Sequence, residues 1–88
     1  MDIKKFIKQH PDMSFIIMMY AAESQNQFGG SCQFEIALTY EEEGELIRRY
    51  KEQGYSLADA NYFGNFKENF SACFMTFISE NTSIKKGE

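Results

Sequence analysis

The fold of this chain turns on the stretch Phe70-Ser71-Ala72-Cys73-Phe74-Met75-Thr76-Phe77-Ile78. As a strand, the stretch is rich in β-forming residues but apolar on both faces, so it needs cover on both sides. As a helix, it continues an apolar spacing of three and four residues that begins at Phe63. Because the helical spacing extends further than the strand pattern, we predict a helix over residues 62–79, with a strand over 70–78 as the alternative.

The preceding segment, residues 40–53, has the pattern of an amphipathic helix. Thr39 and Glu42 have the spacing of a capping box, and Gly54 is a natural stop. Negative charge is favoured at the start of a helix, where four glutamates lie: Glu41, Glu42, Glu43 and Glu45. The buried face is expected to carry Tyr40, Leu46, Ile47 and Tyr50.

The first part of the chain is expected to form a short helix and a β-hairpin. Residues 13–22 are apolar at nearly every position, which indicates a strand covered on both faces. Residues 31–38 alternate between apolar and polar, which is typical of a strand with one buried face and one solvent-exposed face. The polar, glycine-ended segment 23–30 would join the two strands as a long loop. A helix over residues 2–9 would end before Pro11.

These elements predict a small α+β fold with one domain over residues 1–80. The predicted elements are an antiparallel hairpin of residues 13–22 and 31–38, packed against helices over 2–9, 40–53 and 62–79. The polar residues 81–88 are expected to be a disordered tail. Since a two-stranded sheet is marginally stable and exposes both edges, we expect the protein to form a homodimer.

Composition excludes several kinds of partner. The chain has 88 residues, 9 Lys and Arg against 13 Asp and Glu, and a formal net charge of −4. An acidic chain does not attract phosphate backbones, so we expect no nucleic-acid partner. The apolar run at 15–22 is too short to cross a membrane, and we expect neither a signal peptide nor a membrane partner. Nine Phe, five Tyr and five Met are a large apolar load for so small a core, which favours cover by another chain.

The residues that could carry chemistry do not form a recognisable site. Cys32 and Cys73 lie in apolar runs, which indicates buried free thiols in the reducing cytoplasm; a disulfide between them is the alternative. The spacing gives no support for pairing His10 with either thiol as a nucleophile. The cysteines and the glutamates match no zinc or calcium pattern, and Gly29-Gly30 matches no phosphate-binding loop. We therefore expect no metal, no cofactor and no enzymatic activity.

The remaining candidates are aromatic residues, which anchor many protein interfaces. The candidate interaction surface is made of Tyr20, Phe28, Tyr50, Tyr55 and Tyr62. The expected function is that of a small, acidic, self-associating interaction module of the cytoplasm, an inhibitor or immunity-type partner of a basic protein. The alternative is a domain that binds a small molecule in a Phe- and Met-lined pocket between the hairpin and the helices.

Overall fold

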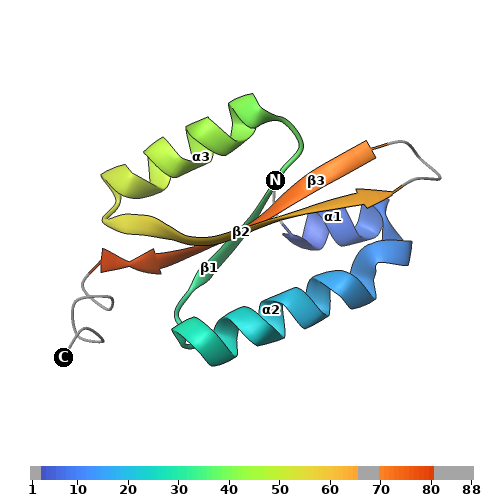
Figure 1. Cartoon of the computed structure of the whole chain (residues 1–88), viewed down its shortest axis with the longest axis horizontal. Helices are drawn as coiled ribbons and strands as arrows, with labels where there is room; N and C mark the ends of the chain where they lie inside the picture. Colours follow the sequence, from blue (N-terminus) through green and yellow to red (C-terminus); the bar gives the residue numbers. More distant parts are fainter. Residues whose placement is uncertain (1–2, 66–69, 81–88) are drawn as a thin grey trace.

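A computed structural model describes residues 3–65 and 70–80 of the chain, and it confirms the α+β class. The elements in chain order are α1 (Ile3–Gln9), the 3-10 turn η1 (Pro11–Met13), α2 (Ser14–Phe28), β1 (Gln33–Ala37), α3 (Tyr40–Glu52), β2 (Tyr55–Asn65) and β3 (Phe70–Ser79). The strands form one sheet in the order β1-β3-β2, and both neighbours run antiparallel to β3. Figure 1 shows α3 over one face of this sheet and α1 and α2 over the other.

The central strand β3 corrects the prediction of a helix over residues 62–79. Its side chains alternate between the two faces of the sheet: Phe74 packs with α1 and α2, whereas Met75 and Phe77 pack with α3. All three are buried. The alternative, a strand over 70–78 covered on both sides, is the correct one, because helices on the two faces supply that cover. The helical spacing failed because Phe63 belongs to a different strand, β2.

The predicted strand over residues 13–22 is also wrong, because these residues lie in η1 and α2. Ile17, Tyr20 and Ser24 are the buried residues of α2, a spacing of three and four positions that suits a helix lying on a sheet. The predicted loop over 23–30 holds the last turns of α2, which ends at Gly29 with a positive φ of 95°. The predicted hairpin is therefore absent from the described residues, and β1 pairs with β3 instead.

The elements with clear local signals are confirmed. Helix α1 spans Ile3–Gln9, and β1 lies within the predicted strand over 31–38. Helix α3 begins after Thr39, whose hydroxyl accepts a hydrogen bond from the Glu42 N–H at 3.0 Å, as predicted. The Glu42 side chain completes the cap one residue earlier than expected, because it accepts from the Leu38 N–H at 2.7 Å. The predicted tail over 81–88 lies outside the described residues.

Each face of the sheet carries its own hydrophobic core. The core under α1 and α2 holds Phe6, Met13, Ile17, Tyr20, Ile36, Ala72 and Phe74. The core under α3 holds Ala37, Leu46, Cys73, Met75 and Phe77. Burial of this apolar surface on both sides of β3 is the main favourable term in folding. No helix in the two described ranges is both long and apolar enough to cross a membrane.

Candidate functional site

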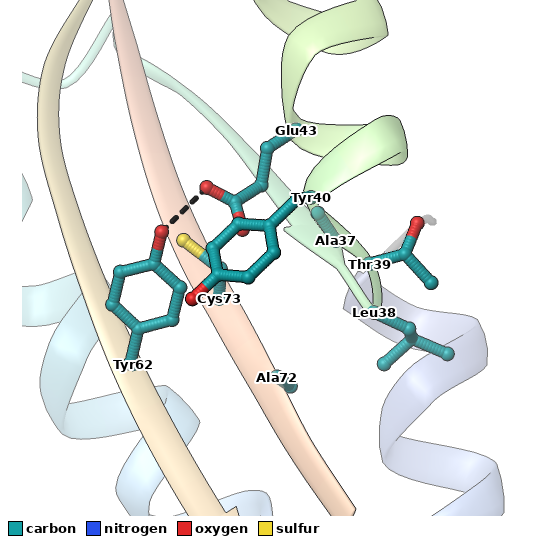
Figure 2. Close-up of a pocket in the computed structure, with 8 residues that line it drawn as sticks. All are labelled: Ala37, Leu38, Thr39, Tyr40, Glu43, Tyr62, Ala72 and Cys73. Atoms are coloured by element: carbon teal, nitrogen blue, oxygen red, sulfur yellow. Dashed lines mark hydrogen bonds between the residues drawn. The ribbon is translucent and has the colours of Figure 1, made fainter.

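A small pocket opens where β1 leads into α3 and where β2 and β3 pass beside that helix. We call it the tyrosine pocket, because the rings of Tyr40 and Tyr62 border it (Figure 2). Its volume is about 110 Å³. The residues that line it are Ala37, Leu38, Thr39, Tyr40, Glu43, Tyr62, Ala72 and Cys73. Three segments that are distant in sequence therefore contribute to one pocket.

The two tyrosines are among the most exposed aromatic side chains that the structure describes. Tyr40 is 82% exposed and Tyr62 is 59% exposed, and their ring centroids lie 6.3 Å apart. The Tyr62 hydroxyl donates a hydrogen bond to the Glu43 carboxylate at 2.6 Å (Figure 2). This bond holds Glu43 beside the aromatic rings. The pocket therefore offers two ring faces and a carboxylate to a molecule in solvent.

The charge around the pocket is negative. Glu41, Glu42 and Glu45 are exposed on the first turns of α3, next to Glu43. The hydrogen bond to Glu43 is the main cause that raises the pKa of Tyr62, so its hydroxyl stays a neutral donor at physiological pH. The pKa of the Cys73 thiol is also raised, first by burial and then by the charge of Glu43. Since the thiolate is the reactive form of cysteine, this thiol is not an activated nucleophile.

The size and chemistry of the tyrosine pocket suit one side chain of a partner protein. Pockets for drug-sized ligands have volumes of about 300–1,000 Å³, several times larger than this one. Aromatic faces next to a carboxylate favour a cationic group, which gains both cation–π attraction and a charge-assisted hydrogen bond. Within residues 3–65 and 70–80, no three His, Cys, Asp or Glu side chains form a cluster that could hold a metal ion.

A second exposed surface lies on the outer face of α2. The large side chains that make up this α2 patch are Phe15, Ile16, Met18 and Met19. Phe15 is 71% exposed and Met18 is 64% exposed. A groove of about 310 Å³ runs between the patch and β2, lined by Phe15, Ile16, Met19, Tyr20, Glu23, Asn61 and Phe63. Exposed apolar surface of this kind marks interaction sites in soluble proteins.

The structure does not bring the five predicted surface residues together. Only Tyr62 belongs to the tyrosine pocket. Tyr20 is buried, and its hydroxyl lies 2.7 Å from that of Thr76. Phe28 is half-buried at the end of α2. Tyr50 and Tyr55 meet edge to face, with ring centroids 5.7 Å apart, and both pack on the core under α3.

Two residues of the tyrosine pocket were missed as site residues because their sequence signals pointed elsewhere. Tyr40 was expected on the buried face of α3, but it lies at the first turn, beyond the edge of the core. Glu43 was interpreted only as a charge that suits the start of a helix. The signal that could have found both is their shared place in the first turn after a strand, where side chains can reach a neighbouring strand.

The groups considered for catalysis, His10 and the two cysteine thiols, do not form a reactive site. His10 and Cys32 do not line the tyrosine pocket, and the Cys73 thiol that does is unreactive. Cys32 and Cys73 are buried free thiols, as predicted. Burial raises the pKa of Cys32 as well. The His10 ring packs against Phe6, with ring centroids 4.6 Å apart.

Comparisons of the chain with protein-family models, with curated proteins and with solved structures find no match. The two exposed surfaces are therefore the features of the molecule that bear on its function.

Proposed function

We propose that the protein is a small, non-enzymatic interaction module of the cytoplasm that binds a basic partner protein through the tyrosine pocket. The observation that carries the proposal is the exposed pair of rings, Tyr40 and Tyr62, held beside Glu43. Tyrosine is enriched among the residues that dominate binding energy at protein interfaces. A cytoplasmic location agrees with the two free thiols, because reducing conditions keep cysteines unpaired.

In this proposal a lysine or arginine of the partner inserts between the rings and the carboxylate. Glu43 can accept from both Tyr62 and the incoming cation, since a carboxylate has about four lone-pair positions. The neighbouring glutamates of α3 accelerate encounter with a basic surface, and salt weakens that effect. A module of this kind acts as an inhibitor or immunity-type partner when the surface it covers is the functional surface of its target.

The test uses synthetic peptides rich in lysine or arginine, with uncharged peptides of the same length for comparison. We expect the basic peptides to bind wild-type protein and to bind more weakly as the salt concentration rises. Tyr40→Ala removes an exposed ring, and Glu43→Gln removes the charge but keeps an acceptor for Tyr62. Both substitutions should weaken binding about tenfold, the cost of roughly 1.4 kcal/mol.

The matched control is Glu45→Gln, which changes the net charge by the same amount on the same helix. Glu45 forms an exposed ion pair with Arg49 at 2.8 Å and does not line the pocket. Its substitution should affect peptide binding much less than Glu43→Gln. Equal effects of the two substitutions would mean that net charge, and not the pocket, attracts the peptides. Equal binding of basic and uncharged peptides would contradict the proposal.

The groove between α2 and β2 favours a second candidate, binding of a small apolar molecule. Its volume of about 310 Å³ lies at the lower limit for small-molecule sites, and Phe15, Met19 and Phe63 are among its lining residues. A ligand that binds only the folded state raises the melting temperature in a concentration-dependent manner. A panel of hydrophobic ligands that leaves the melting temperature unchanged would count against this candidate.

A further inference from the structure

We propose that the α2 patch and the free edge of β2 together form the interface of a symmetric homodimer, in which β2 pairs antiparallel with β2 of a second copy. The inference rests on the proposed function as an interaction module, but it assigns the second copy to a surface other than the tyrosine pocket. Its starting point is the groove that α2 and β2 share.

The α2 patch is as large as the largest apolar patch of a typical monomer, but it is too small to be a whole interface. If a large side chain has an area of about 200 Å², the exposed fractions of its four residues amount to roughly 450 Å². This value lies within the size of the largest apolar patch on a monomer, about 300–600 Å². A stable interface needs about 800 Å² from each partner. A neighbouring element must therefore supply the rest.

The outer edge of β2 is that neighbouring element. In the described sheet β2 pairs on one side only, with β3. The other edge strand, β1, is only 5 residues long, whereas β2 has 11. Short strands, charges, prolines and bulges protect natural edges from pairing. The bulge of β2 lies near Leu57, and residues 60–65 beyond it contain neither charge nor proline.

A second copy fits both features with a single two-fold axis. A two-fold axis can place the β2 edges of two identical copies side by side in antiparallel orientation, so the second copy needs no sequence different from the first. Because Asn61 and Phe63 of β2 line the groove with residues of α2, β2–β2 pairing places the two grooves next to each other. The result is a six-stranded sheet with both α2 helices on one face and both tyrosine pockets on the other. Pairing centred near Tyr62 keeps the two Asp59 carboxylates at opposite ends of the ladder.

The charges at this surface disfavour the other occupants. Among the described residues that line the groove, Glu23 is charged and none is Lys or Arg. Helices that lie on anionic membranes carry cations beside their apolar face, and nucleic-acid sites carry them toward the phosphates. An apolar surface bordered by an acid lacks both attractions, whereas a second copy of the same surface buries it against identical apolar side chains.

The test is the mass of the full chain in solution by light scattering and sedimentation over the micromolar range. Wild-type protein should have twice the monomer mass of 10.2 kDa. Two variants place charged side chains in the two elements of the proposed interface. The first combines Phe15→Glu with Met19→Glu on α2, and the second is Asn61→Lys on the edge of β2. Each should raise the dimer dissociation constant at least about tenfold, because charge is placed in an apolar interface.

The control is Ile47→Glu, which places one negative charge, half of what the α2 variant adds, on an exposed apolar position of α3. Ile47 is 37% exposed and lies across the sheet from the α2 patch. This variant should remain dimeric, and circular dichroism should show that all variants keep their fold. A wild-type monomer at every concentration, or a dimer that both interface variants leave intact, would overturn the inference.

The outcome separates this inference from the proposed function. The monomeric α2 variant should still bind basic peptides, since the tyrosine pocket lies on the opposite face of the sheet. Loss of the dimer with peptide binding intact supports both statements. Peptide binding by a protein that is always monomeric overturns only the dimer. A monomer stabilised by an apolar ligand would assign the groove to a small molecule.

Discussion

The hydroxyl groups of Tyr20 and Thr76 lie 2.7 Å apart, and they join α2 to the central strand across 56 positions of sequence. The Ser24 hydroxyl lies 3.0 Å from the same Thr76 oxygen. Thr76 is fully buried, so these bonds replace the water that its hydroxyl loses on folding. A fully satisfied polar group in a core fixes how the helix sits on the sheet.

Removal of single members of this cluster should have unequal effects on the free energy of unfolding. Tyr20→Phe keeps the ring, and Thr76 keeps Ser24 as a partner, so we expect a loss of about 1 kcal/mol. Thr76→Val leaves both Tyr20 and Ser24 without Thr76 as a partner, so the loss should be about 2–3 kcal/mol. Urea denaturation measures both values. Equal losses would mean that Ser24 does not support Thr76.

The same tyrosine should make the protein sensitive to alkaline pH. Burial is the main cause that raises the pKa of Tyr20 from 10.0 to about 12. The stabilising contribution of the neutral phenol is complete below pH 10, because neither state is then ionised. Above that pH the unfolded state loses its proton first, so the free energy of unfolding should fall from about pH 10 to 12.

Denaturation of Tyr20→Phe over the same pH range is the test of that assignment. The variant should show a shallower fall than wild type. Some of the fall should remain, because the pKa of Tyr50 is also raised, by burial and by its hydrogen bond to Glu35. Identical slopes for wild type and variant would exclude Tyr20 as a source of the alkaline sensitivity.

Two glycines should respond to alanine in opposite directions. Gly44 lies inside α3 with nothing within 4 Å of an added Cβ, so Gly44→Ala should stabilise the protein by about 1 kcal/mol. Gly54 follows α3 with a φ of 86°, where a side chain is strained, so Gly54→Ala should destabilise it by about 1 kcal/mol. Melting temperatures of the two variants provide the measurement, and a shift of the same sign for both would contradict this prediction.

Both cysteines should react slowly with thiol reagents in the folded protein. Cys32 and Cys73 are buried, and burial raises the pKa of each thiol. Little thiolate is therefore present at neutral pH, and access to it is restricted. Labelling should become fast for both residues in denaturant. Fast labelling of Cys73 in the native protein would mean that the tyrosine pocket opens to solvent as far as its sulfur atom.

Elements with a local sequence signal, such as a helix cap or a strict alternation of apolar and polar residues, could be predicted from the sequence. The remaining elements are determined by tertiary packing. The cap at Thr39 and the alternation in β1 depend on neighbouring residues, so both were visible in the sequence. Residues 13–22 and 70–78 are both apolar at consecutive positions, a pattern that fits either period. The first run was predicted as a strand and forms a helix, and the second was predicted as a helix and forms a strand. Only the tertiary fold determines which of the two runs is covered on both sides. Strand β3 is covered, whereas α2 leaves Phe15 and Met18 exposed.

The candidate site was less predictable than the fold. The sequence marks Tyr62 as a candidate only because it is aromatic, whereas its contact with Glu43 depends on how α3 lies over β2. Tyr40 matched the helical stripe of buried residues, yet the helix begins beyond the core it covers. Periodicity predicts which face of a helix a side chain lies on. It does not predict whether the sheet extends far enough to cover that side chain.

The strand order β1-β3-β2 has a consequence for the growing chain on the ribosome. Every ladder of the sheet includes β3, so β1 and β2 have no partner strand until residues 70–79 have been synthesised. Both helical layers lack their platform for the same period, which lasts several seconds at about 5–20 residues per second. The apolar residues of α2 and β2 lack their strand partners until then, so we expect the sheet and both helical layers to form together in one cooperative step once β3 is present.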